Sequence, residues 1–121
     1  FGKALRWAEK SVNIDNKLGD TYAEKAKVFC YGWDNYNQNP FTIDDRIVAK
    51  LSYDNYVKAE SKGYRGASKK NWFEDNAKDV LYGKAQWFMA DDKVKRTRVI
   101  STLTSDYDWV TESLKAESTW K

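Results

Sequence analysis

Apolar and aromatic residues recur at spacings of three and four along most of the chain. The first examples are Leu5, Ala8, Val12, Tyr22, Ala26, Phe29 and Trp33. An α-helix places residues at this spacing on one face, so the pattern indicates amphipathic helices. Strand-like alternation does not extend beyond a few residues. The pattern therefore predicts an all-α fold, with helices over residues 2–14, 20–36, 43–61, 68–90, 93–104 and 106–119.

Turn signals separate the predicted helices. Gly19 precedes Asp20, a residue type that caps helix N-termini, and a residue before a proline, such as that before Pro40, avoids the helical conformation. Thr42 and Asp45 have the spacing of a capping box at the start of the third helix. Short turns between amphipathic helices predict antiparallel helical hairpins. Periodicity alone leaves open whether they stack as an array or pack as an irregular bundle.

The small residues of the first helix give a resemblance to a known family. Ala4, Ala8 and Ser11 are spaced by four and then three, which lets a neighbouring helix approach closely, and Tyr22 begins the next helix with a large aromatic residue. This arrangement resembles the junction between two tetratricopeptide repeats. Lys25 departs from the family pattern, which has a large aliphatic residue there.

A weaker instance of the same spacing occurs at Ser52, Tyr56 and Ala59. The resemblance is fair over residues 3–33, loose over 49–90 and absent beyond. The length of 121 residues predicts a single domain over residues 1–121, and the resemblance implies that its helical hairpins stack as a right-handed superhelix. Because the chain begins at Phe1 without an initiator methionine, we expect it to be a fragment of a longer protein.

The resemblance also implies a function. In the tetratricopeptide family the first helix of each pair lines a concave groove, and the corresponding positions here are Asp20, Lys27 and Tyr31. The chain is then a non-catalytic scaffold that binds another protein or a peptide, needs no cofactor and can join a larger assembly.

Two alternatives stay open. The chain has six tryptophans and eight tyrosines, and exposed rings can stack on sugars, as in a carbohydrate-binding helical protein of a bacterial envelope. We expect two or three tryptophans to be partly exposed, above all Trp120 beside the C-terminus. The chain could instead be a purely structural fragment. The bacterial envelope, periplasm and cytoplasm all remain open as its location.

The residues that usually perform catalysis are scarce. The chain has no histidine, which removes Ser-His-Asp and Cys-His systems and the usual zinc ligand sets, and its six glycines form no phosphate-binding loop. We therefore predict no enzymatic activity and no metal. The single cysteine, Cys30, lies between Phe29 and Tyr31 and is predicted to be a small buried residue.

Positive charge is concentrated in one short run. Lys93, Lys95, Arg96 and Arg98 place four cations within six residues, a density that can contact an acidic partner or phosphates. Asp91-Asp92 partly balances this run, as on an ordinary solvated helix face. The net charge of only +3 argues against a nucleic-acid partner. No apolar stretch approaches the roughly 18 to 20 residues that cross a bilayer.

Overall fold

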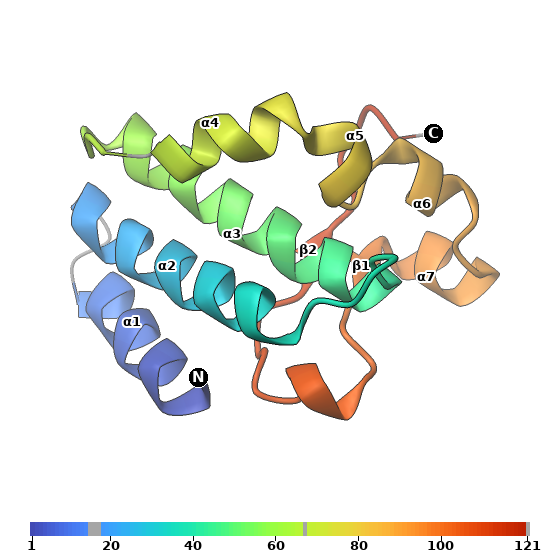
Figure 1. Ribbon diagram of the computed structural model, residues 1–121, viewed down its shortest axis with the longest axis horizontal. Helices are drawn as coiled ribbons and strands as arrows, with labels where there is room; N and C mark the ends of the chain where they lie inside the picture. The colour runs from blue at the N-terminus through green and yellow to red at the C-terminus, as the bar shows by residue number, and fades with distance from the viewer. Residues whose placement is uncertain (15–17, 67, 121) are drawn as a thin grey trace.

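The computed structural model describes residues 1–14, 18–66 and 68–120 and is mostly helical, as predicted (Figure 1). The first three helices are α1 (Gly2–Ile14), α2 (Gly19–Tyr36) and α3 (Ile43–Ser61). Their bounds agree with the predicted ones to within one residue. Successive helices run in alternating directions, so α2 and α3 form an antiparallel hairpin with α1 beside α2.

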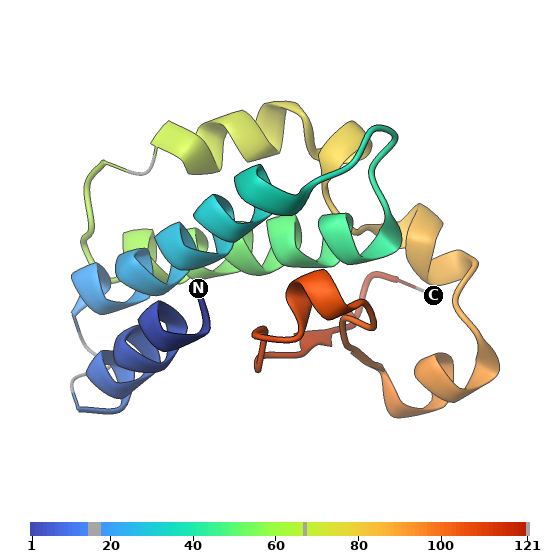
Figure 2. The same ribbon diagram turned by 60° about the horizontal axis from the view of Figure 1, so that its bottom comes forward.

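The rest of the chain is built from short elements. They are α4 (Ser68–Asp75), α5 (Ala77–Val80), α6 (Lys84–Phe88), α7 (Asp92–Thr97), β1 (Val99–Ile100), the 3₁₀ helix η1 (Ser105–Tyr107) and β2 (Leu114–Lys115). The two strands pair antiparallel, with Ile100 opposite Leu114. Figure 2 shows α4 and the C-terminal segment on opposite sides of the α2–α3 hairpin. No helix in the described part of the chain is long and apolar enough to cross a membrane.

The single helix predicted over 68–90 is wrong, because the chain there is divided into α4, α5 and α6. Asn76 donates its side-chain amide to the Trp72 carbonyl at 2.9 Å, the local bond by which asparagine competes with helical geometry. Arg46 of α3 donates to the carbonyls of Lys78 and Leu81. These tertiary bonds satisfy carbonyls that a continuous helix would have used.

The helices predicted over 93–104 and 106–119 are also wrong. The first ends at Thr97, since Arg98 adopts a left-handed conformation with φ of 57°. Over residues 101–119 serine and threonine are frequent, and their side chains favour caps and turns over helix interiors. Thr102, for example, donates its hydroxyl to the Tyr107 carbonyl. Within this segment the described structure is one 3₁₀ turn and a short strand.

Two aspartates at the start of α3 hold the C-terminal segment. Asp44 accepts hydrogen bonds at 2.8 Å from the backbone amides of Leu103 and Thr104 and from the Thr104 hydroxyl. Asp45 accepts from the Tyr107 hydroxyl at 2.6 Å and forms the predicted capping box with Thr42. The capping box is confirmed, and the same carboxylate also fixes a segment sixty residues away in sequence.

Small side chains let α2 and α3 pack closely. The Ser52 hydroxyl donates to the Ala26 carbonyl at 2.8 Å, and both residues are buried. A Cβ on Gly19 would lie 2.6 Å from the Ala59 carbonyl oxygen, so glycine is required at this crossing. Ser52, Tyr56 and Ala59, which are spaced by four and then three residues on α3, are all buried.

The small residues of α1 are less uniform. Ala8 is buried, as the resemblance implies, whereas Ala4 and Ser11 are exposed. Only the central position of this stripe therefore lies against a neighbour. The face of α1 that packs on the protein is formed by Leu5, Ala8 and Val12, which recur at the spacing of an amphipathic helix.

Substituting Ala8 with tryptophan is expected to lower the free energy of unfolding by about 1 to 3 kcal/mol, because a buried small residue cannot be enlarged without forcing α1 away from its neighbours. Urea denaturation followed by circular dichroism measures the change. Ala4→Trp, on the exposed side of the same helix, is the matched control. An unchanged midpoint for Ala8→Trp would contradict the packing of α1.

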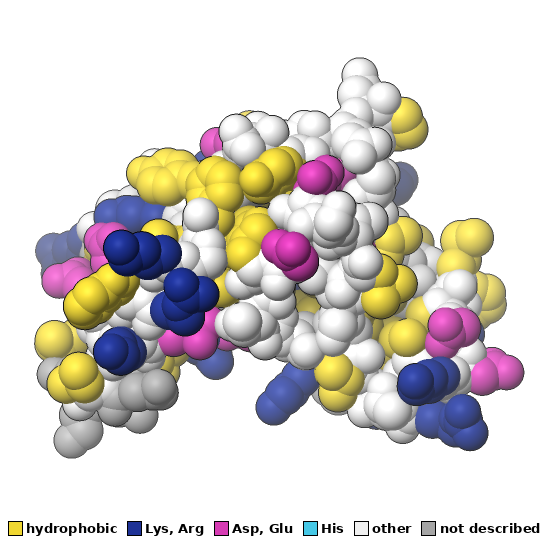
Figure 3. Space-filling view, turned by 90° about the horizontal axis from the view of Figure 1, so that it is seen from below, with side chains coloured by type: hydrophobic (Ala, Val, Ile, Leu, Met, Phe, Trp, Pro, Cys, Tyr) yellow, Lys and Arg dark blue, Asp and Glu magenta, His cyan; other side chains and the backbone are white. Residues whose placement is uncertain are grey.

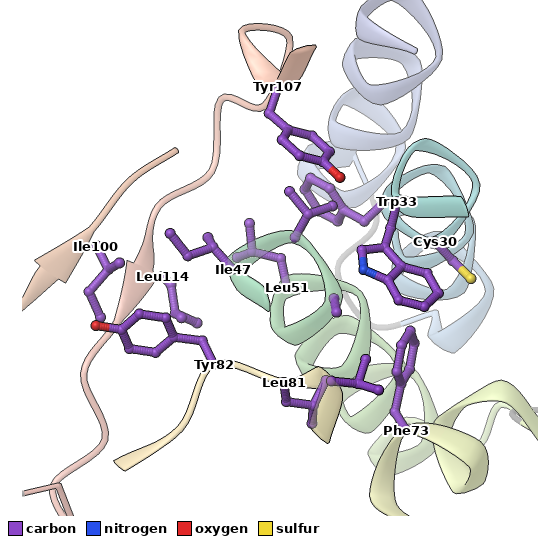
Figure 4. Packing of buried hydrophobic residues seen from close by; sticks show 14 of the residues in the cluster. Cys30, Trp33, Ile47, Leu51, Phe73, Leu81, Tyr82, Ile100, Tyr107 and Leu114 are labelled. Atoms are coloured by element: carbon purple, nitrogen blue, oxygen red, sulfur yellow. The ribbon is translucent and has the colours of Figure 1, made fainter. Parts of the chain in front are cut away.

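One core joins nearly all elements. Leu5, Phe29, Ile47, Phe73 and Leu114 come from α1, α2, α3, α4 and β2 and are all buried. Figure 4 shows Ile47, Phe73 and Leu114 in this core. The predicted burial of the single cysteine is confirmed, and burial raises the pKa of its thiol to about 11.

The exposure predicted for Trp120 is wrong. The ring is only 5% exposed, and it packs against Tyr82 and Trp87. The exposed tryptophans are Trp7 and Trp72 instead. Closeness to the C-terminus did not leave Trp120 in solvent, because a large apolar ring stabilises the fold most when it is buried.

Candidate functional site

The three groove residues suggested by the sequence lie along α2. Asp20 is exposed in its first turn, Lys27 is partly buried and Tyr31 is 61% exposed. The Lys27 ammonium pairs with Glu24 at 3.3 Å and lies 5.9 Å from the centre of the Tyr64 ring. Burial acts to lower the pKa of Lys27, but Glu24 and Tyr64 outweigh it and raise this pKa above its usual value.

Residues from the next part of the chain extend this surface. Tyr64 precedes α4, and Lys69 and Trp72 lie on α4, which contacts α2 through the buried Trp33 ring. Trp72 is 40% exposed. We name the set made by Lys27 and Tyr31 of α2, Tyr64, and Lys69 and Trp72 of α4 the α2–α4 face. It combines aromatic rings with two ammonium groups.

Three rings surround the Lys69 ammonium. The Trp33, Trp72 and Phe73 centroids are 5.6 to 6.1 Å apart, and the ring planes are inclined by 56° to 70° to one another. The Lys69 Nζ lies 4.2 Å from the Trp72 centroid and within 5.7 Å of the other two. Cation–π attraction therefore orders Lys69 beside Trp72.

The inner wall of this cluster is the Trp33 indole. Trp33 is almost fully buried, and its Nε1 has no hydrogen-bond partner among the described residues. In Figure 4 the ring lies near Cys30 and Phe73, with its nitrogen turned away from Cys30. A rigid, buried tryptophan behind Lys69 and Trp72 keeps this part of the α2–α4 face in a defined position.

The sequence pattern suggests Lys27 and Tyr31 as candidates but not Tyr64, Lys69 or Trp72. Trp72 had been recognised only as one of six tryptophans. The spacing of Lys69, Trp72 and Phe73 shows that they share a side of one helix, but not that this helix lies beside α2. Only the tertiary fold brings the two groups together.

The basic run lies elsewhere, on and just after α7, at the opposite end of the molecule from the start of α2 (Figure 1). Two of its members have structural contacts. Lys95 donates to the Phe88 carbonyl at 2.9 Å, and Arg98 donates to the Glu117 carbonyl while its guanidinium lies 5.3 Å from the Trp87 ring centre. Lys93 and Arg96 are exposed, and the described residues provide no partner for either. The two predicted binding groups therefore do not form one site.

A charged network joins the helices to the C-terminal segment. Lys25, the departure from the repeat pattern, pairs with Glu112, which also accepts from the Asn55 side chain at 3.1 Å. The nearby buried Lys50 pairs with Asp54 at 2.8 Å and Glu117 at 3.4 Å. Burial raises the pKa of Asp54, and Lys50 opposes that shift.

These carboxylates are held by internal cations, so the network acts as a link between α2, α3 and the C-terminal segment. In the part of the chain that the structure describes, no three side chains of His, Cys, Asp or Glu are grouped to hold a metal ion.

Comparisons with protein-family models, curated proteins and solved structures find no match for this chain. A function can therefore be argued only from its own residues and their arrangement.

Proposed function

We propose that the chain is a non-catalytic protein-interaction module, built from helical hairpins like those of tetratricopeptide repeats, that binds a peptide on the α2–α4 face. The observation that carries the proposal is the presence of two exposed aromatic side chains, Tyr31 and Trp72, on helices that contact one another. Aromatic residues are frequent hot spots of protein interfaces, because a rigid ring buries much area at little entropic cost.

The order of the helices supports this proposal. In the repeat family, first helices of successive hairpins lie side by side and line the groove. In this proposal α2 and α4 are the first helices of two successive hairpins. Trp33 of α2 contacts Trp72 and Phe73 of α4. The proposal requires a peptide long enough to contact both Tyr31 of α2 and Trp72 of α4.

The charge beside the face favours an acidic peptide. Residues 58–70 carry five basic side chains and one acidic side chain. Lys58 and Lys62 lie 5.7 Å from the Tyr22 ring centre, and Lys69 lies on the face itself. Cations held against rings attract carboxylates and guide their approach, which improves association rate and specificity.

Peptides selected on this protein from a random displayed library should be rich in aspartate, glutamate and aromatic residues. Their affinity should fall by about tenfold or more in Tyr31→Ala and in Trp72→Ala, since hot-spot truncations cost about 2 kcal/mol or more and tenfold corresponds to about 1.4 kcal/mol. Isothermal titration calorimetry measures the change. The matched control is Trp7→Ala, which removes another exposed tryptophan from α1.

Charge reversal of Lys95 and Arg96 should mainly alter the salt dependence of binding. Three results together would place the peptide on an electrostatic site at α7 instead of the α2–α4 face. Tyr31→Ala and Trp72→Ala would keep full peptide affinity, the charge reversal would abolish it, and the affinity would fall steeply with added salt.

The exposed Trp7 and Trp72 also keep the carbohydrate alternative open. A glycan array distinguishes the two functions. Binding to a defined glycan that is lost in Trp7→Ala or Trp72→Ala, with no peptide selected from the library, would overturn the peptide proposal in favour of sugar binding.

A further inference from the structure

The turn between α6 and α7 exposes two large apolar side chains next to each other. Phe88, the last residue of α6, is 70% exposed, and Met89 is 87% exposed. Exposing such side chains to water is unfavourable, and neighbouring exposed apolar residues commonly mark a contact surface. Both lie outside the α2–α4 face, so the proposed peptide site does not account for them.

Basic side chains lie around this apolar pair. The Lys95 ammonium bonds to the Phe88 carbonyl and lies 5.6 Å from the Phe88 ring centre. Lys93 and Arg96 are exposed on the same short helix. Two acids, Asp91 and Asp92, also lie here. Asp91 accepts a hydrogen bond from the Val94 amide at 2.9 Å as the cap of α7. We name the group formed by Phe88, Met89, Lys93, Lys95 and Arg96 the α6–α7 tip.

The α6–α7 tip is fixed to the body of the protein. Trp87, which precedes the apolar pair, is buried in the core beside Trp120. Arg98 follows α7, covers the Trp87 ring and bonds to the Glu117 carbonyl. Binding at the tip would therefore hold the whole domain.

We propose that the α6–α7 tip binds the surface of membranes that contain anionic phospholipids. Phe88 and Met89 enter the interfacial region, and Lys93, Lys95 and Arg96 contact the phosphates of the head groups. Apolar residues that reach the acyl boundary, with cations at the level of the head groups, are the combination that binds proteins to anionic bilayers without a spanning segment.

The shape of the tip favours a membrane over a peptide or a nucleic acid. The α6–α7 turn forms one outer end of the molecule in two views, and Figure 3 shows hydrophobic, basic and acidic side chains together at that end. A projecting end that carries adjacent apolar side chains can enter a broad, soft surface such as a lipid interface. Nucleic acid would make use of the cations but gives no role to an exposed methionine.

Vesicle sedimentation tests the proposal. The intact chain should bind vesicles of phosphatidylcholine with 30% phosphatidylserine, and binding should be weak to phosphatidylcholine alone. Two double variants test the apolar and the charged residues of the tip separately. The Phe88→Ser, Met89→Ser variant removes the apolar pair. The Lys93→Glu, Arg96→Glu variant reverses two cations that hold no internal bond in the described structure. The apolar variant should bind about tenfold more weakly and the charge variant about thirtyfold more weakly or worse.

Matched controls separate the tip from general effects. Lys3→Glu with Lys78→Glu lowers the formal net charge by the same amount on exposed residues of α1 and α5, and Leu103→Ser removes an exposed apolar side chain from another loop. Both controls should bind anionic vesicles as the parent does.

Three results would overturn the proposal: no binding to the anionic vesicles, equal loss in the charge control, or equal competition by an oligonucleotide in the parent and in the Phe88→Ser, Met89→Ser variant. Circular dichroism of each variant checks that it is folded. Peptide binding at the α2–α4 face should be unchanged in the tip variants, so the two proposals fail separately.

Discussion

Replacing Asp45 with alanine is expected to lower the free energy of unfolding by about 3 to 5 kcal/mol. The carboxylate is buried and accepts hydrogen bonds from the Tyr107 hydroxyl at 2.6 Å, from the Thr42 amide at 2.9 Å and from the Gln38 amide at 3.0 Å. Removing it leaves these donors without their acceptor and removes the capping box of α3. The C-terminal segment also loses its bond through Tyr107.

Thermal and urea denaturation measure this effect. Asp45→Asn keeps the size of the side chain and one carbonyl oxygen, so it should be less destabilising than Asp45→Ala. Asp34→Ala, an exposed acid on α2, is the control and should change stability by less than about 0.5 kcal/mol. A loss below about 1 kcal/mol for Asp45→Ala would contradict the role given to this carboxylate.

Phe73→Ala is the second substitution with a large expected effect, about 3 to 5 kcal/mol. Phe73 is fully buried and contacts the Trp33 and Trp72 rings at centroid distances of 5.9 and 5.6 Å. Truncation leaves a cavity where α4 meets α2 and α3. It also removes a ring that lies beside the Lys69 ammonium, so the α2–α4 face should lose its fixed geometry.

Both consequences can be measured. Denaturation gives the stability change, and calorimetry with a selected peptide gives the change in affinity under conditions where the variant is folded. Phe73→Leu keeps most of the volume and should cost less than about 1.5 kcal/mol. If Phe73→Ala were as stable as the parent, α4 would not pack as described. If it bound peptide with full affinity, the position of α4 would not matter for the site.

The first three helices were predictable because their signals are local. In α1 and α2 the buried positions, such as Leu5, Ala8 and Phe29, recur every three or four residues. The start of α3 is fixed by Thr42 and Asp45, whose capping box needs only residues three apart. Where neighbouring residues determine the structure, the pattern was sufficient.

The prediction for the second half of the chain failed because long-range hydrogen bonds determine its structure. The backbone amides of Leu103 and Thr104 bind Asp44, about sixty residues earlier, and the Tyr82 amide donates to the Arg46 carbonyl. The spacing of apolar residues along the chain does not reveal such distant hydrogen-bond partners. Apolar residues at spacings compatible with a helix were therefore interpreted as helix, although the chain follows the surface of α3 in short pieces.

The candidate site was predictable to the same limited degree. Lys27 and Tyr31 could be proposed from the sequence because the repeat resemblance assigns groove positions to α2. Lys69 and Trp72 were missed because their place beside α2 depends on how α4 packs, which is set by the buried contacts of Phe73 with Trp33. The basic run was found from composition alone, and its apolar neighbours Phe88 and Met89 gained meaning only through their exposure.

Nuclear magnetic resonance titration with a selected acidic peptide locates the binding site residue by residue, because each tryptophan gives its own indole N–H signal. If the peptide binds on the α2–α4 face, the signals of the Trp72 indole and of the Lys27, Tyr31 and Lys69 amides should shift with added peptide. The signals of the exposed Trp7 indole and of the α7 amides should not shift. Shifts confined to α7, or to Trp7 and α1, would contradict peptide binding on the α2–α4 face.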